Sequence, residues 1–172
     1  MNDQTPQYCP ACGTRLDSRE IEGRSRAYCS SCETPVYRNP KPCAGVLVVD
    51  DGELLLVKRT QPPGVGTWSV PAGFLEYDEP PAVGAVRELE EETGVTVSSG
   101  ALELFDTTFV TAGDRGNVLV VIYRVKREAT TGRPEPGSDA GDARFWKMNA
   151  LRNADEQIES GYEAVFQRAR TF

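Results

Sequence analysis

Seven carboxylates crowd the 23 residues from Gly73 to Val95, where Arg87 is the only cation. Like charges this close together repel one another when no counter-ion is bound. Hard divalent ions such as Mg²⁺ and Mn²⁺ prefer oxygen ligands and usually bridge carboxylates to the phosphates of a substrate. The segment therefore predicts metal-assisted chemistry on a phosphate compound. Its carboxylates are Glu76, Asp78, Glu79, Glu88, Glu90, Glu91 and Glu92.

Capping signals predict the helix that would carry most of these groups. Asp78 suits the N-cap position, Pro80 and Pro81 are tolerated in a first helical turn, and Gly94 is a typical C-terminal stop. We therefore expect a helix from about residue 79 to residue 93.

The expected helix has distinct faces, because successive residues are about 100° apart. Glu88, Glu91 and Glu92 share one arc, whereas Glu90 projects nearly opposite and is expected to be a solvated charge. Taken alone, such an acidic arc is more often an ordinary solvent-exposed face than a metal site. The core face would comprise Ala82, Ala85, Val86, Leu89 and Thr93.

The residues around the carboxylates change this balance. The spacing is Gly, five residues, Glu, seven residues, and then Arg-Glu-Leu-x-Glu-Glu-x-Gly-Val. It resembles the signature box of the Nudix hydrolase superfamily, whose members use water and a metal to break the phosphoanhydride bond of a nucleoside diphosphate derivative. All nine specified positions match: Gly73, Glu79, Arg87, Glu88, Leu89, Glu91, Glu92, Gly94 and Val95.

The resemblance implies a role for each polar residue of the box. Glu79 and Arg87 would form a supporting ion pair that holds the loop to the helix. The ligands of a catalytic Mg²⁺ or Mn²⁺ would be the carboxylates of Glu88, Glu91 and Glu92 and the backbone carbonyl of Gly73.

The general base is constrained by composition. The chain contains no histidine, so an imidazole base is excluded. Hydrolysis must then use a carboxylate, a metal-activated water, or both. In some relatives the base lies in the box, and in others it lies on a distant downstream loop. The downstream candidates here are Asp139 and Asp142, or Asp114 in an earlier turn.

The amino-terminal cysteines form a second motif. Cys9-x-x-Cys12 and Cys29-x-x-Cys32 are sixteen residues apart, which is typical of a structural zinc site, with two disulfides as the alternative. The polar first residues show no secretory signal, so we expect a cytoplasmic protein, where disulfides are rare. We therefore predict a zinc ribbon over residues 1–38. Cys43 is expected to be a buried small residue at a strand start.

The net charge and the hydropathy of the chain indicate which classes of partner to expect. The net charge of −7 argues against nucleic acid as the main ligand, although four arginines lie between residues 15 and 26. No apolar run approaches the ~20 residues of a membrane helix. We expect a small-molecule nucleotide as the partner, and relatives suggest a homodimer.

The remaining residues predict the elements of one larger domain, residues 39–172. Residues 45–59 are typical of a hairpin with an Asp51-Gly52 type I′ turn, and Trp68 is more typical of core packing than of a substrate wall. Residues 128–143 predict a surface loop. Further strands are expected at Leu102–Val110, Asn117–Lys126 and Arg144–Met148. An amphipathic helix is expected at Asp155–Ala169, with Ile158, Tyr162, Val165, Phe166 and Ala169 facing inward.

This order predicts the α/β (α+β) class, with a mixed sheet between helices. The resemblance implies the same arrangement, a Nudix-type α/β/α sandwich preceded by the ribbon.

The ribbon ahead of the box is similar to that of two Nudix subgroups. One comprises NADH pyrophosphatases, and the other comprises shorter enzymes that include FAD and ADP-ribose pyrophosphatases. The NADH group carries a segment rich in Trp and Pro soon after the box, whereas residues 103–118 here contain neither. We therefore expect an FAD- or ADP-ribose-like dinucleotide or nucleotide sugar, cut to monophosphates. The alternatives are NADH or a nucleoside triphosphate, or a nucleic-acid-binding or regulatory protein with an inactive Nudix fold.

Overall fold

The computed structural model describes residues 6–62, 64–111, 116–138 and 140–169. The chain divides into two compact units, one that holds the residues up to Pro40 and one that holds almost all of those from Lys41 onward. None of the helices that the structure describes has the length and apolar character needed to traverse a lipid bilayer.

The first unit is a three-stranded antiparallel sheet. Its strands, in the order β1-β2-β3, are β1 (Asp17–Ile21), β2 (Arg24–Cys29) and β3 (Thr34–Val36). Glu22 and Gly23 join β1 to β2 with φ values of 54° and 71°, as a type I′ turn requires. Of the residues described in this unit, only Cys9 and Cys29 are buried. An apolar core therefore contributes little to its stability.

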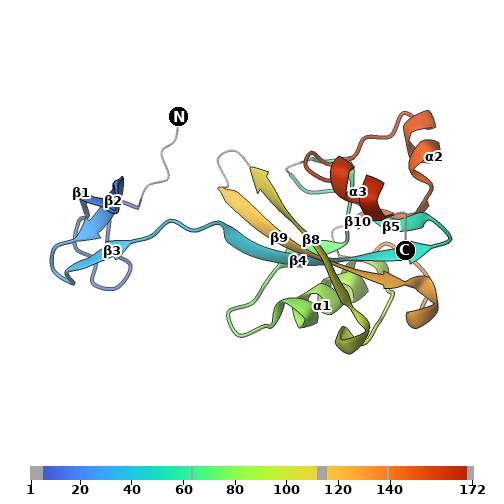
Figure 1. The fold of residues 1–172 in the computed structure, drawn as a ribbon, viewed down its shortest axis with the longest axis horizontal. Coiled ribbons are helices and arrows are strands. Elements are labelled where there is room, and N and C mark those ends of the chain that lie inside the picture. Colours follow the sequence, from blue (N-terminus) through green and yellow to red (C-terminus); the bar gives the residue numbers. More distant parts are fainter. Residues whose placement is uncertain (1–5, 63, 112–115, 139, 170–172) are drawn as a thin grey trace. The chain divides into compact units, whose positions relative to one another are not determined.

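The second unit is built on a seven-stranded mixed sheet (Figure 1). The strand order is β10-β5-β4-β9-β8, with β6 paired to β5 and β7 to β4. The β4–β9 pair is parallel, and the other pairs are antiparallel. The strands are β4 (Lys41–Asp50), β5 (Glu53–Arg59), β6 (Trp68–Ser69), β7 (Ala72–Phe74), β8 (Glu103–Thr111), β9 (Asn117–Lys126) and β10 (Ala140–Trp146).

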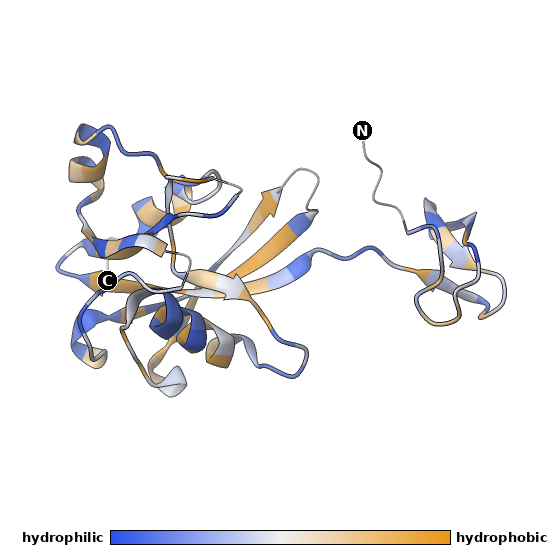
Figure 2. Cartoon of the chain, turned by 180° about the vertical axis from the view of Figure 1, so that it is seen from behind, coloured by the Kyte–Doolittle hydropathy of each residue, from blue (hydrophilic) through white to orange (hydrophobic). Residues whose placement is uncertain are grey.

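Helices cover both faces of this sheet. Helix α1 (Pro81–Thr93) lies on one face, and α2 (Met148–Asn153) and α3 (Glu163–Ala169) lie on the other (Figure 1). This confirms the expected α/β/α sandwich with a mixed sheet. Because side chains alternate along a strand, β4 and β5 supply both cores. Figure 2 shows apolar residues following these central strands.

Two apolar clusters form the core of this unit. The first includes Leu47, Leu54 and Phe166 on the α3 side, and the second includes Val46 and Leu89 on the α1 side. Both central strands alternate between the clusters, and the middle of each strand is buried.

The β4–β5 hairpin has the turn that the sequence predicts. Asp51 and Gly52 have φ values of 45° and 77°, so both adopt the positive φ of a type I′ turn. Strand β4 begins at Lys41 rather than at Gly45, because its first half pairs with β9 and β7. Cys43 is buried near the start of this strand, as expected.

Trp68 is a core residue, as predicted. Its side chain is 1% exposed and meets the ring of Trp146 edge to face at 5.3 Å. The indole Nε1 donates a 3.0 Å hydrogen bond to Glu156, whose carboxylate also accepts two 2.9 Å hydrogen bonds from Lys58. The buried indole N–H is therefore satisfied, as the burial of a polar group requires.

The predicted start of helix α1 is wrong. The helix begins at Pro81 and its N-cap is Pro80, which is extended (φ −61°, ψ 141°), so Asp78 does not cap it. The cause is steric, since a proline pushes the residue before it out of the helical region, so Pro81 keeps Pro80 extended and Pro80 disfavours a helical Glu79. The end is as predicted, with Gly94 in the left-handed conformation (φ 67°).

The predicted helix over Asp155–Ala169 is also wrong, because only α3 is helical. Asp155 and Gly161 have positive φ values of 56° and 100°, which interrupt a helix. The backbone before α3 pairs instead with β6: Trp68 N–H donates to Gln157 O (2.8 Å) and Glu159 N–H donates to Trp68 O (2.9 Å). The residues expected to face inward still do so, with Ile158 half-buried and Tyr162, Val165, Phe166 and Ala169 buried.

The last strand differs in its bounds. Arg144–Met148 was the predicted range, but β10 runs from Ala140 to Trp146 because its backbone pairs with β5 over that length. Met148 instead begins α2, which the sequence pattern did not indicate. Part of the predicted loop over residues 128–143 is therefore strand.

Candidate active site

Strand β7 brings the loop of the box against helix α1. Gly73 pairs with Ala44 of β4, and a methyl group at Gly73 would lie 2.1 Å from the Glu88 carboxylate. Real side chains do not approach so closely, so the Glu88 carboxylate occupies the space that glycine leaves open. The structure thus places Glu88 directly on the backbone of Gly73.

The three box carboxylates of α1 lie in different environments. Glu92 is 8% exposed and its Oε2 accepts a 3.0 Å hydrogen bond from the backbone N–H of Ala72. The side chain of Glu88 is 14% exposed, whereas that of Glu91 is 51% exposed. Helical periodicity grouped these residues on one arc, but it did not distinguish the buried carboxylate from the accessible one. Glu90 is exposed, as expected.

The guanidinium of Arg87 donates hydrogen bonds to several groups of the box. Its Nε and Nη2 each donate a 2.9 Å hydrogen bond to Glu79, and Nη2 also donates to the carbonyl oxygen of Phe74 (3.1 Å). Its Nη1 donates to Glu88 (2.7 Å) and Glu91 (3.2 Å). The guanidinium therefore joins the loop to the helix and partly offsets repulsion among the carboxylates.

Glu79 depends on a residue that the motif does not specify. A methyl group at Gly84 would lie 2.6 Å from Glu79 Oε2 and 2.4 Å from Leu75 Cδ2, so a larger residue would displace this carboxylate or the leucine from the helix surface. Hydrogen bonds from Arg87 lower the pKa of Glu79. The close contact spans two elements, so the local sequence pattern gave no direct signal of it.

We expect Arg87→Lys to lower the free energy of unfolding of the second unit by about 1–2 kcal/mol at neutral pH, because a lysine cannot reproduce the planar fork. Because folding lowers the pKa of Glu79, the ion pair stabilises the fold at pH values above the ordinary pKa of a carboxyl group. This contribution is lost as the pH falls through the lowered pKa. Urea unfolding followed by tryptophan fluorescence measures it, because Trp68 and Trp146 both belong to this unit.

The matched control is Arg124→Lys, which removes a similar fork on an exposed strand surface. Arg124 donates to Glu103 at 2.9 Å and 3.0 Å, and the Glu103 side chain is 56% exposed. We expect this change to cost much less than Arg87→Lys, because solvent screens the exposed pair. An equal cost for both variants, or a cost for Arg87→Lys that does not shrink in acid, would contradict the structural role of the Arg87–Glu79 pair.

The downstream base candidates are only partly described. Asp142 lies on β10 opposite Lys58 and forms an ion pair with Arg144. Asp114 and Asp139 lie outside the described residues, so their positions stay predictions.

The four predicted zinc ligands do come together. The Sγ atoms of Cys9, Cys12, Cys29 and Cys32 all lie within 4.8 Å of one another, and all four thiols are free. Zn–S bonds of about 2.3 Å in a tetrahedron place sulfurs roughly 3.8 Å apart, so the cluster fits the ion. Within the described part of the chain, it is the one group of three or more such ligands already gathered for a metal. In the box, Arg87 Nη1 lies between Glu88 and Glu91 and donates to both carboxylates.

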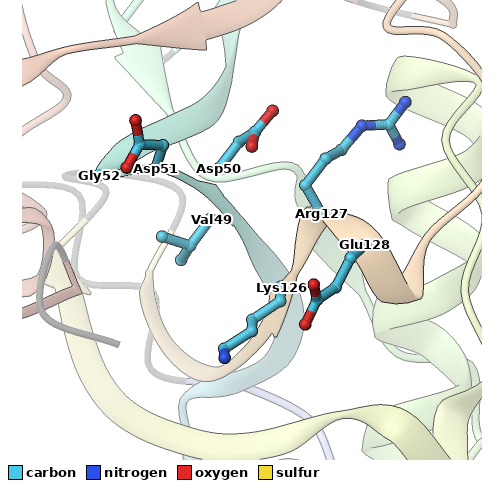
Figure 3. A pocket seen from close by; sticks show the side chains of 7 residues that line it. All are labelled: Val49, Asp50, Asp51, Gly52, Lys126, Arg127 and Glu128. Carbon is cyan, nitrogen blue, oxygen red and sulfur yellow. The ribbon is translucent and has the colours of Figure 1, made fainter.

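A separate hollow lies at the β4–β5 turn. It has a volume of about 410 Å³ and no residue of the box lines it. Figure 3 shows its lining, which combines three acidic side chains, Asp50, Asp51 and Glu128, with the basic side chains of Lys126 and Arg127. The residues are Val49, Asp50, Asp51, Gly52, Lys126, Arg127 and Glu128. The hollow lies at the end of β4, whereas Gly73 pairs with Ala44 near the start of that strand. The hollow is therefore distinct from the carboxylate site.

Comparison with known proteins places the chain among characterised relatives. A MutT-like protein of Streptomyces ambofaciens is 36% identical over 97 residues, which cover 56% of this chain and 58% of that protein. An ADP-ribose pyrophosphatase of Methanocaldococcus jannaschii is 29% identical over 116 residues, 67% of each chain. An NAD-capped RNA hydrolase NudC of Vibrio atlanticus is 35% identical over 98 residues, 56% of this chain but 35% of that enzyme.

Solved structures agree on the fold. The crystal structure of a NUDIX hydrolase from Nitrosomonas europaea has a TM-score of 0.71 and 24% sequence identity, and the match covers 95% of this chain and 90% of that one. Among the relatives by sequence, this chain covers less than two thirds of the length of the Streptomyces protein. The model of the NUDIX domain matches residues 39–168, which include every residue of the box. The chain therefore belongs to the NUDIX family.

Proposed function

We propose that this protein is a metal-dependent pyrophosphatase. Its substrate is a nucleoside diphosphate derivative of the FAD or ADP-ribose kind, which it hydrolyses to two monophosphates. The observation that carries the proposal is the packing of Glu88 on Gly73 beside a buried Glu92 that Ala72 N–H holds in place. Relatives named as an ADP-ribose pyrophosphatase and an NAD-capped RNA hydrolase support this substrate class.

The residues present fit Mg²⁺ or Mn²⁺. The groups assigned to the site are hard oxygen donors, and the Glu88 carboxylate lies against the backbone of Gly73. Glu88, Glu91, Glu92 and the carbonyl of Gly73 would hold the ion. When bound, the metal supplies charge neutralisation for the diphosphate and for the departing phosphate oxygen.

The chain's own groups do the positioning. Ala72 N–H fixes Glu92, and Arg87 with Glu79 holds the loop on the helix, so the carboxylates are oriented before the substrate arrives. Glu91 is half-exposed, so it meets solvent and incoming substrate most directly. Because the chain has no histidine, the carboxylates are the acceptors that this site offers for the proton of the attacking water, whether or not a metal also activates that water.

We further propose that residues 1–38 are a structural zinc ribbon and that residues 39–172 are the catalytic domain. Four thiolates close the shell of a zinc ion and leave no position for catalysis. The near absence of a core among the described residues of the ribbon supports a structural role for the metal. Assembly into a homodimer, which the family resemblance suggests, is measured by light scattering.

A substrate panel with Mg²⁺ or Mn²⁺ tests the proposal. We expect FAD to yield AMP and FMN, and ADP-ribose to yield AMP and ribose 5-phosphate. At least one of them should show a kcat/KM about tenfold or more above NADH and nucleoside triphosphates, a discrimination of roughly 1.4 kcal/mol. The expectation for NADH comes from the family resemblance, because residues 103–118 lack the Trp- and Pro-rich segment that the NADH enzymes carry after the box.

Two results would redirect the assignment. Fastest turnover of a triphosphate, with release of pyrophosphate, would move the substrate to that class. No hydrolysis of any compound with either metal, together with a gel shift of an oligonucleotide, would replace the enzyme with a nucleic-acid-binding protein.

A further inference from the structure

Residues 130–138, which we call the capping segment, run along the C-terminal end of α1. Glu135 N–H donates to Thr93 O (2.9 Å), and Gly137 N–H donates to Glu92 O (3.1 Å). A helix leaves its last four carbonyls without partners, and Gly94 N–H satisfies only Glu90 O. The capping segment thus supplies donors for two of the remaining three, from more than 40 residues further along the chain.

The electrostatics of this helix end make these donors important. The last turn of α1 contains no basic residue, yet it carries the carboxylates of Glu91 and Glu92. Negative charge at the C-terminal end of a helix is unfavourable, because the helix dipole is negative there. Backbone N–H groups from the capping segment carry partial positive charge at this position. They pair with the free carbonyls and offset the negative charge at the helix end.

Two glycines allow the backbones to approach. A methyl group at Gly137 would lie 2.3 Å from Glu91 O, and one at Gly132 would lie 2.5 Å from Gly94 O. The approach is maintained at the other end by Thr131, whose N–H and C=O both bond to Thr96 and whose hydroxyl lies 2.7 Å from that of Thr96. Contact this close requires glycine at position 137 and couples the segment directly to the last turn of the helix.

We propose that the capping segment is a clamp that sets the position of the metal-binding carboxylates, with Gly137 as the positioning residue. Glu92 is held at both ends, through its side chain by Ala72 N–H and through its carbonyl by Gly137 N–H. Metal ligands must be placed to within about 0.5 Å for productive geometry. This inference rests on the proposed function, which assigns Glu91 and Glu92 to the metal.

Gly137→Ala tests the clamp, because its methyl group must push the segment and the last turn of α1 apart. We expect the Mg²⁺ concentration for half-maximal activity to rise about 5- to 20-fold and kcat to fall about 10- to 100-fold, while KM for the nucleotide changes less than about threefold. Binding of Mn²⁺ alone, followed by electron paramagnetic resonance, should weaken in parallel. A purely structural role would lower the melting temperature and leave the metal affinity of the folded protein unchanged.

The matched control is Gly100→Ala, the same chemical change at a surface glycine with only Ser98 Oγ at 3.8 Å. It should behave as the wild type. A folded Gly137→Ala with wild-type metal affinity and kcat would overturn the clamp, provided that the wild type shows metal-dependent hydrolysis. If the wild type neither binds Mn²⁺ nor hydrolyses nucleotide, the proposed function fails instead.

Hydrogen exchange of the wild type gives a second test that needs no variant. Coupling is reciprocal, so metal bound at the carboxylates must stabilise the clamp. We expect saturating Mg²⁺ with a nonhydrolysable nucleotide to slow exchange of the Glu135 and Gly137 amides at least about fivefold, while the amides of β1 and β2 do not change. Unchanged exchange at Glu135 and Gly137 would overturn the proposal.

Discussion

Glu91→Gln and Glu92→Gln are each expected to reduce turnover by about 10²–10⁴-fold, the scale of losing a charge-stabilising or acid–base group. Glutamine keeps the size of the side chain, and at position 92 its amide oxygen can still accept from Ala72 N–H. The change therefore removes charge without removing the buried contact. Steady-state kinetics at saturating Mg²⁺, with circular dichroism to verify the fold, measures the effect.

The adjacent residue provides the matched control. Glu90 lies on the same turn but is exposed on another face, so Glu90→Gln should stay within about twofold of wild-type turnover. Added Mn²⁺ should partly restore Glu91→Gln, whose side chain is half-exposed, more readily than Glu92→Gln. A loss below threefold for both substitutions would remove the metal assignment of the box.

Loss of zinc is the second large effect that we expect. Protein purified without chelator should carry about one zinc per chain, and Cys9→Ser combined with Cys12→Ser should abolish it, since two thiolates do not hold a structural site. Because so little of the ribbon is buried, this unit should then unfold, and limited proteolysis should cleave within residues 6–38. Metal analysis by mass spectrometry provides the measurement.

Cys43→Ser is the control for this experiment. Cys43 is buried in β4 of the other unit, outside the cluster, so its replacement should leave the zinc content at the wild-type value. Absence of zinc from the wild-type protein, or retention of zinc by the double serine variant, would contradict the ribbon. Resistance of residues 6–38 to protease without metal would contradict the structural role of the ion.

The sequence alone determined the features that depend on neighbouring residues. The spacing of the box identified the helix, its solvated Glu90 and its glycine stop at Gly94, because capping and helical periodicity are local. The Asp51-Gly52 turn was predicted for the same reason, since positive φ at both positions is a property of these residue types. The cysteine spacing likewise predicted a cluster that the structure assembles.

Local patterns were misleading where long-range backbone pairing was stronger. Residues 155–169 have a helical apolar period, but the backbone of Gln157 and Glu159 bonds to Trp68, about 90 positions earlier, and the helix is reduced to α3. Strand β10 starts early because β5 offers partners from Arg59 to Leu54. No window of sequence contains both members of such pairs, so periodicity could not reveal them.

Only the tertiary structure distinguished the three carboxylates of the helix. Burial of Glu92 against Ala72, contact of Glu88 with Gly73 and exposure of Glu91 arise where β7 meets α1, not from the helix itself. The capping segment is a second example, because the sequence marked it only as a surface loop. Residue types and spacing decide which groups are present, whereas the close approach of separate backbones decides which of them are held, paired or accessible.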